Sequence, residues 1–338
     1  DNLEFVDLRE ELEKNHIAWD SPACCSSKES SYSLLRAQMQ GTFQFSREGV
    51  WIKDFEHDKK CLSLLHLAKQ KSCDLVLFPE YCISDQVLWD IVSDEALWPE
   101  NRKLWVLPCQ GMTKDQFQAF IENLSKNNRV FLLDTACTSR RVTFNHFVTV
   151  LFYCFLGYQG DASILCLVPQ LKTQPMGDQD CLCEQAGMAT GSVVFTLEQR
   201  LLTLLCADSM NNELTWQRLQ EEGLLMSGLT ILHPQLNGHP KDQVFSRLRW
   251  ELFERGTPGV YITCNWAAGT TLSSPECQEA AKTIDLSWSC LYRKHADDIF
   301  EKWERNYSLR RNNEAHGLFG TIMKPKRTEV WFSLSHEE

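Results

Sequence analysis

Three residues lie far apart along the chain, each at or just after the end of an apolar segment, and their side chains could together perform covalent catalysis. Glu80 ends the run LVLFPE, Lys172 ends the run ILCLVPQLK, and Cys206 ends the run LLTLLC. A carboxylate at the rim of a buried strand is partly desolvated, which moves its pKa toward the range of a general base. A cysteine thiolate is a nucleophile, and a lysine beside it would stabilise the anion.

The segment around Cys206 predicts a turn that presents the thiol. A mostly apolar strand over residues 201–205 would deliver the thiol to a sharp turn, and a polar helix would begin near Asn211 or Asn212. This strand–turn–helix order is typical of hydrolase nucleophiles. The helix N-terminus would lower the thiol pKa, and the N–H of Ala207 would face the same point as an oxyanion donor.

Each of the three residues also has an ordinary interpretation. A glutamate after a strand is more often a surface residue, and a lysine after a turn is usually a solvated cation. Cys206 is one of 15 cysteines in the chain. The argument therefore depends on the three positions taken together.

Taken together, the motifs resemble those of the carbon–nitrogen hydrolase (nitrilase) superfamily. The sequence FPE at Phe78–Glu80, the pair Leu171–Lys172 and the C-x-D motif at Cys206–Asp208 occur in the family's order Glu, Lys, Cys. About 90 residues separate Glu80 from Lys172, as in that family. The flanking segments 141–150, 190–206 and 251–267 are also similar to the family's strands around its lysine, cysteine and final asparagine.

The resemblance implies a fold and a reaction. The expected fold is α/β, a four-layer α-β-β-α sandwich of the nitrilase type. The implied activity is hydrolysis of a non-peptide C–N bond, in an amide or a nitrile, through a thioester on Cys206 with Glu80 and Lys172 completing the triad. The resemblance implies no cofactor, and the expected partner is a small amide or nitrile substrate. Members of the family usually associate with copies of themselves, so the resemblance also implies a homo-oligomer.

The resemblance also names auxiliary residues, with departures from the family pattern. A second carboxylate about eight residues beyond the lysine falls at Asp180, with Glu184 as the alternative. Glu213 keeps the family's spacing after the cysteine, but the Arg, aromatic and Pro residues that usually precede it are replaced by CADSMNNE. Asn265 and Trp266, at the end of a predicted strand, are implied to line the substrate pocket.

The elements that must position these residues alternate between strands and helices. Residues 1–32 are expected to form a helical extension (3–15) and a linker (21–33), followed by a single domain over residues 33–338. Periodicity predicts helices at 55–70, 114–126, 212–222 and 243–255. Strands are expected at 34–38, 73–79, 103–108, 129–136, 192–196, 201–205, 229–233, 260–264, 318–323 and 330–334. A hairpin of 142–155 and 162–168 is expected around Gly157 and Gly160. Such alternation indicates a layered α/β fold.

Composition and charge exclude several classes. The 338 residues carry 34 basic and 45 acidic side chains, a net charge of −11, which argues against direct nucleic-acid binding. The longest apolar run, residues 147–158, is shorter than the roughly 20 residues that a membrane helix needs. The charged first 14 residues contain no secretory signal core, so we expect a cytoplasmic protein with reduced, scattered cysteines.

No metal is predicted. Cys181 and Cys183 form a C-x-C pair without a second pair at zinc-site spacing, and the nine histidines show no H-x-x-x-H pattern.

Two other functions compete with hydrolysis. The chain starts without an initiator Met, which suggests a fragment or a processed chain. The domain would then serve as a binding or assembly module beside a partner domain, such as that of a defence-associated reverse transcriptase. Acyl transfer from the same thioester to an amine is the third hypothesis.

Overall fold

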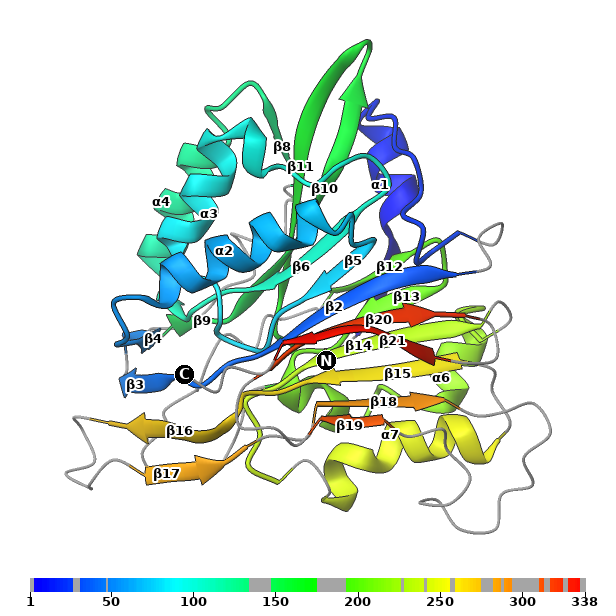
Figure 1. Cartoon of the computed structure of the whole chain (residues 1–338). Helices are drawn as coiled ribbons and strands as arrows, with labels where there is room; N and C mark the ends of the chain where they lie inside the picture. Colours follow the sequence, from blue (N-terminus) through cyan, green and yellow to red (C-terminus); the bar gives the residue numbers. More distant parts are fainter. Residues whose placement is uncertain are drawn as a thin grey trace.

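The computed structural model describes residues 3–26, 31–46, 48–133, 147–174, 193–225, 228–239, 242–255, 259–274, 282–286, 289–293, 310–312, 317–324 and 328–334. Two large β-sheets and the helices on their outer faces make up most of this structure (Figure 1).

The first sheet has seven strands and carries the predicted nucleophile. Its order is β1 (Glu4–Asp7), β12 (Val193–Leu197), β13 (Leu201–Thr203), β14 (Leu229–Pro234), β15 (Gly259–Cys264), β18 (Ser289–Arg293) and β19 (Arg310–Asn312). The strands β13, β14 and β15 are parallel, so their carboxyl ends lie at the same edge.

The second sheet has eight strands and carries the other two predicted catalytic residues. Its order is β21 (Thr328–Leu334), β20 (Gly317–Met323), β2 (Tyr32–Gln38), β5 (Leu75–Leu77), β6 (Leu104–Pro108), β10 (Val150–Gln159), β11 (Ala162–Leu171) and β8 (Val130–Leu132). The predicted hairpin around Gly157 and Gly160 is confirmed, because β10 and β11 pair antiparallel along their whole length. Residues 142–146 of that prediction lie outside the described residues.

Smaller elements complete the fold. A four-stranded sheet has the order β17 (Lys282–Asp285), β16 (Ala268–Ser273), β3 (Thr42–Ser46) and β4 (Gly49–Ile52). A two-stranded sheet pairs β7 (Met112–Thr113) with β9 (Phe147–Val148). Among the described residues, the helices are α1 (Leu8–Lys14), α2 (His57–Gln70), α3 (Asp85–Ser93), α4 (Lys114–Leu124), α6 (Trp216–Glu221) and α7 (Gln243–Glu254), with 3₁₀ turns η1 (Glu95–Leu97) and η2 (Cys206–Met210).

Alternating side chains on the strands define the layers. On β2, Leu35 packs among residues of α2, α3 and α4, whereas its neighbour Leu34 packs between the two sheets. On β13, Leu201 faces the other sheet, and Leu202 packs with α6 and α7. Three apolar cores therefore separate four layers in the order helix, sheet, sheet, helix (Figure 1), which confirms the predicted α-β-β-α sandwich.

The start of the chain differs from the expectation. The segment predicted as a helix from residue 3 begins with strand β1, which pairs in parallel with β12 from Glu4–Val193 to Asp7–Thr196. Helix α1 follows, capped by the Asp7 side chain, and buries Leu8 and Leu12 in the core between the sheets. Tertiary pairing outweighs the helical preference of this charged segment.

Among the described residues, no helix is both long and apolar enough to cross a membrane. Eleven cysteines of these residues are buried free thiols, as the scattered pattern predicted.

Gln170 on β11 connects the two sheets through polar bonds inside an apolar core. Its amide donates to the carbonyl O of Thr203 on β13 at 2.8 Å, and its Oε1 accepts from the N–H of Phe195 on β12 at 2.9 Å. The side chain is 1% exposed. It satisfies backbone groups of both β12 and β13, near the turn that begins at Cys206.

We expect Gln170→Leu to lower the free energy of unfolding by about 2 to 4 kcal/mol, because two buried backbone groups would lose their partners. Urea unfolding followed by circular dichroism measures this change. The exposed Gln220→Leu on α6 is the control and should change stability by less than about 0.5 kcal/mol. Equal effects of the two substitutions would contradict the assigned role of Gln170.

Candidate active site

Glu80 lies three residues beyond strand β5, on the loop that leads into α3. Its side chain is almost completely buried, and Oε1 lies 2.9 Å from the Lys172 Nζ. Oε2 accepts the N–H of Leu236 at 3.1 Å, and the Glu80 carbonyl O accepts the indole N–H of Trp266 at 2.8 Å. The next residue, Tyr81, has a φ of 60°, a left-handed conformation that turns the chain sharply after the carboxylate.

Lys172 directly follows strand β11 and is equally buried. Its backbone N–H donates to the Thr149 carbonyl O at 2.9 Å, and its Nζ lies 5.7 Å from the centre of the Tyr81 ring. Both side chains are at most 3% exposed. Removing either charge from water is unfavourable, and the attraction between the two opposite charges offsets that cost. Glu80 and Lys172, 92 positions apart in sequence, therefore form one buried unit.

Cys206 begins the 3₁₀ turn η2 directly beyond β13 and Leu204–Leu205. Its φ is 40°, and it is fully buried. A left-handed φ at a non-glycine residue is strained, and such strain is common where a nucleophile sits on a strand-to-helix turn. The predicted sharp turn is thus present, and the predicted helix follows it as α6, but this helix begins at Trp216 and not near Asn211 or Asn212.

The backbone of Leu236 connects the sulfur of Cys206 to the ion pair. Its carbonyl O lies 3.9 Å from the Cys206 Sγ, while its N–H donates to the Glu80 Oε2. Leu236 follows the carboxyl end of β14, the strand next to β13. The fold therefore brings Glu80, Lys172 and Cys206 to one region, where the carboxyl ends of strands from the two sheets meet.

Asp208, two residues beyond the cysteine, ties the lysine loop to the cysteine turn. Its Oδ1 accepts the N–H groups of Thr173 and Gln174 and the Thr173 hydroxyl, and its Oδ2 accepts the N–H of Leu205. Complete burial raises the pKa of Asp208 to about 6, although the charge of Lys172 and these backbone donors oppose the rise. The residue holds the backbone on both sides of the site.

His233 on β14 is a site residue that the sequence did not reveal. Its Nε2–H donates to the Cys206 carbonyl O at 2.7 Å, and its Nδ1 accepts from the Tyr261 hydroxyl at 2.8 Å. Burial lowers the pKa of His233 to about 3, so the ring is neutral, as this pair of bonds requires. A single histidine at a strand end has no motif, so only the fold shows that it supports the cysteine turn.

The remaining predicted residues have mixed placements. Trp266 contacts the Glu80 backbone, and Asn265 is buried beside it, with its amide bonded to the Asn237 carbonyl O at 2.8 Å. Glu213 is exposed and accepts the N–H of Leu3 at 2.7 Å, so it is bonded to the N-terminal segment. Ala207 is buried within η2. Asp180 and Glu184 lie outside the described residues.

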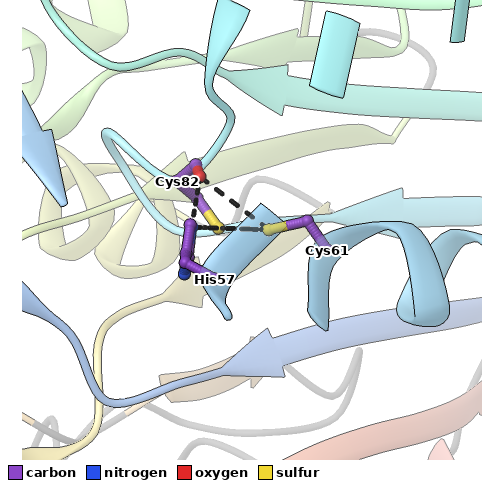
Figure 2. A group of neighbouring side chains, drawn as sticks. All are labelled: His57, Cys61 and Cys82. Atoms are coloured by element: carbon purple, nitrogen blue, oxygen red, sulfur yellow. Dashed lines mark hydrogen bonds between the residues drawn. The ribbon is translucent and has the colours of Figure 1, made fainter. Parts of the chain in front are cut away.

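A second group of chemically active side chains lies near Glu80. His57, Cys61 and Cys82 are at most 2% exposed, and their ligand atoms lie within 4.8 Å of one another (Figure 2). Burial opposes ionisation of Cys61, but hydrogen bonds to Cys82 and His57 outweigh it and lower the Cys61 pKa to about 6. Burial raises the pKa of the Cys82 thiol well above its usual range. Of the described residues, this is the group whose donor atoms suit a metal.

Comparison with known proteins finds similar structures but no matching sequence. No protein-family model and no curated protein matches the chain. Among solved structures, an amidase from Nesterenkonia sp. is similar over 88% of this chain and 92% of its own, with a TM-score of 0.46 and 11% identity. A second structure is a variant of the Nesterenkonia sp. AN1 amidase with the acetamide moiety of fluoroacetamide added covalently at its active site cysteine. It is similar over 87% of this chain and 90% of its own, with a TM-score of 0.46 and 10% identity.

A further variant, described as a Nesterenkonia AN1 amidase from the nitrilase superfamily, is similar over 88% of this chain and 92% of its own, with a TM-score of 0.45 and 11% identity. At these TM-scores and identities, the assignment of the fold rests on this chain's own sheets and cores.

Asp208 makes a testable contribution to the pH dependence of stability. Because its folded-state pKa lies above the ordinary value of about 3.9, folding favours its protonated form. The resulting stability is present below about pH 4 and is lost as the pH rises through about 6. In Asp208→Asn, this loss, on the order of 2 to 3 kcal/mol, should disappear.

Urea unfolding of both proteins at pH 4.5 and pH 7 gives the difference in stability at each pH. The wild type should lose more stability than Asp208→Asn between the two values. The exposed Asp115→Asn on α4 controls for removal of one carboxylate. A wild-type-minus-variant difference that is the same at both pH values would contradict the raised pKa.

Proposed function

We propose that this protein is a cysteine hydrolase that cleaves a non-peptide C–N bond, in an amide or a nitrile, with Glu80, Lys172 and Cys206 as its catalytic residues. The observation that carries the proposal is the buried Glu80–Lys172 pair, joined to the Cys206 turn through the two backbone groups of Leu236. A base, a cation and a thiol gathered from three distant segments at the ends of strands are the groups that acyl transfer to sulfur requires.

For an amide, each residue has a defined role in the proposed reaction. Glu80 accepts the proton of the Cys206 thiol, and the sulfur attacks the carbonyl carbon to give a tetrahedral oxyanion. The charge of Lys172 and the N–H of Ala207 stabilise this anion. Glu80 then protonates the leaving nitrogen as the C–N bond breaks, leaving a thioester. It next removes a proton from water as the water oxygen attacks the thioester carbon, and it returns this proton to the Cys206 sulfur as the C–S bond breaks, which releases the acid and restores the thiol.

The supporting residues explain how this geometry would persist. The bonds of Asp208 to Thr173 and Gln174 fix the segment after Lys172, and the bond of His233 to the Cys206 carbonyl O fixes the turn. Preorganised polar groups need no rearrangement when charge develops, which is the main source of electrostatic catalysis.

The proposal also covers the substrate, the oligomeric state, the location and the auxiliary residues. We infer a small-molecule substrate, a homo-oligomer and a cytoplasmic location, with Asp180 or Glu184 as the auxiliary carboxylate and Asn265 and Trp266 lining the substrate site. The alternative is an assembly module that keeps the fold with little hydrolase activity, as beside a reverse transcriptase. Reactivity of the cysteine distinguishes the two.

The test compares the reactivity of Cys206 with that of every other cysteine, ten of which are buried thiols among the described residues. Cys206 is fully buried, as are most of the others, so exposure alone would not favour its modification. Iodoacetamide at neutral pH, with peptide mass spectrometry over time, should modify Cys206 ahead of the other cysteines; Cys61, whose pKa is lowered to about 6, is followed separately. Glu80→Gln and Lys172→Ala should each slow that modification.

The same variants should lose about 10²- to 10⁴-fold in the hydrolysis of short aliphatic amides and nitriles, measured as released ammonia. Cys206→Ala should lose all of it. The control is Lys103→Ala, which breaks a partly buried lysine–aspartate pair with Asp74 at 2.6 Å. Slow, unselective labelling with no ammonia released from any substrate would favour the assembly module.

A further inference from the structure

His57, Cys61 and Cys82 form a second group of side chains, which shares no residue with the Glu80–Lys172–Cys206 site. The geometry of this group suits a metal ion. His57 and Cys61 are four positions apart on α2, so their side chains lie on the same face of the helix. Cys82 comes from the loop after β5, and Figure 2 shows its side chain directed toward the other two. Two elements thus supply three donors.

The separations of the donor atoms match those around a single small cation. The Cys61 Sγ lies 3.4 Å from the His57 Nε2 and 3.8 Å from the Cys82 Sγ, and the Cys82 Sγ lies 3.9 Å from the His57 Nε2. A point equidistant from three atoms so spaced lies about 2.1 Å from each, within the range of about 2.0 to 2.3 Å for zinc–nitrogen and zinc–sulfur bonds.

We propose that His57, Cys61 and Cys82 bind a zinc ion in a buried structural site. Thiolate and imidazole donors together select zinc over hard cations such as magnesium or calcium. The Cys82 carbonyl O, 2.6 Å from the His57 Nε2, borders the same space and is the nearest candidate for a fourth ligand.

Binding requires a defined exchange of protons. In the metal-free protein, Nε2 carries the ring proton, because the Cys82 carbonyl O can only accept. Coordination through Nε2 moves that proton to Nδ1 and replaces this hydrogen bond. Both sulfurs bind as thiolates, so the protons that the metal-free group holds on them pass to solvent, and the zinc ion keeps its oxidation state. The site therefore needs reduced cysteines and no further reactant.

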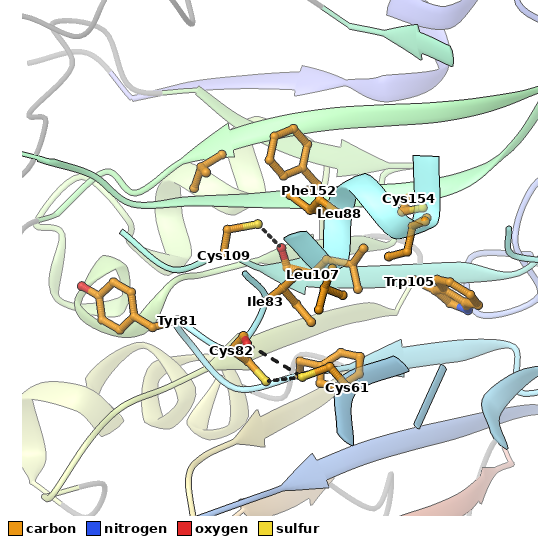
Figure 3. Packing of buried hydrophobic residues seen from close by; sticks show 14 of the residues in the cluster. Cys61, Tyr81, Cys82, Ile83, Leu88, Trp105, Leu107, Cys109, Phe152 and Cys154 are labelled. Atoms are coloured by element: carbon orange, nitrogen blue, oxygen red, sulfur yellow. Dashed lines mark hydrogen bonds between the residues drawn. The ribbon is translucent and has the colours of Figure 1, made fainter. Parts of the chain in front are cut away.

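The ion would fix the loop that carries Glu80. Cys82 is two residues beyond Glu80, and the His57 ring lies 5.9 Å from that of Trp266, which bonds the Glu80 carbonyl O. Cys61 and Cys82 also belong to the same apolar core as Ile83, Leu107 and Cys109, part of which Figure 3 draws. A zinc ion there would join α2 to this loop without touching the substrate.

The test uses the full chain produced with added zinc under reducing conditions and measures bound metals by mass spectrometry. The wild type should hold about one zinc per chain. Cys61→Ser, Cys82→Ser and His57→Gln should each hold far less. Cys154→Ser, which removes another thiol of the same core, should keep the zinc, and so should a Cys181→Ser/Cys183→Ser double variant, which removes the C-x-C pair of the sequence.

Cobalt substitution keeps the proposal testable if a variant unfolds. Wild-type protein produced with cobalt should show thiolate-to-cobalt charge-transfer absorption and the intense visible bands of a tetrahedral site, and zinc should raise its midpoint of urea unfolding. Absence of stoichiometric metal, copper in place of zinc, or a Cys61–Cys82 disulfide seen as a loss of two hydrogens in the purified protein would overturn the proposal.

Discussion

The buried ion pair between Glu80 and Lys172 is the constraint on which the site depends. Two charges in an apolar interior are tolerated only as partners, so the loops that carry them must stay in register. The strands β5 and β11 set that register within one sheet. The facing sheet brings Cys206, and Leu236 contacts both sides. Any rearrangement that moved the loop after β5 away from the end of β11 would leave a buried charge without compensation, which makes the arrangement cooperative.

Polar bonds across the core between the sheets reinforce this constraint. Gln170 satisfies backbone groups of the opposite sheet just before Lys172, and Asp208 does the same just after it. Most of the hydrogen bonds of these two residues go to backbone groups, so the residues fix positions without taking part in chemistry. The neutral His233 supports the cysteine turn from the adjacent strand. Such buried networks are stabilising only when every member is satisfied.

Much of the fold was predictable because short apolar runs between polar turns have few alternatives to a buried strand. The segments that became β5, β6, β14 and β15 illustrate this. Strand β1 was not predictable, since its charged sequence favours a helix and only pairing with β12 makes it extended. The proposed catalytic residues Glu80, Lys172 and Cys206 followed from the order of motifs that resemble those of a known family, whereas His233 and the His57–Cys61–Cys82 group depend on contacts between segments without a local pattern. His57 and Cys61 do share helical spacing, but Cys82 joins them only through the loop.

The position of β2 within the eight-stranded sheet has a consequence for biosynthesis. This early strand lies between β5 and β20, and its pairing with β20 joins residues between 279 and 291 positions apart, from Gln38–Gly317 to Tyr32–Met323. A ribosome adds only about 5 to 20 residues each second, so one edge of β2 stays unpaired for many seconds while the intervening chain is made. The nascent polypeptide must be shielded during that interval, which predicts a dependence on chaperones that the finished molecule would not show.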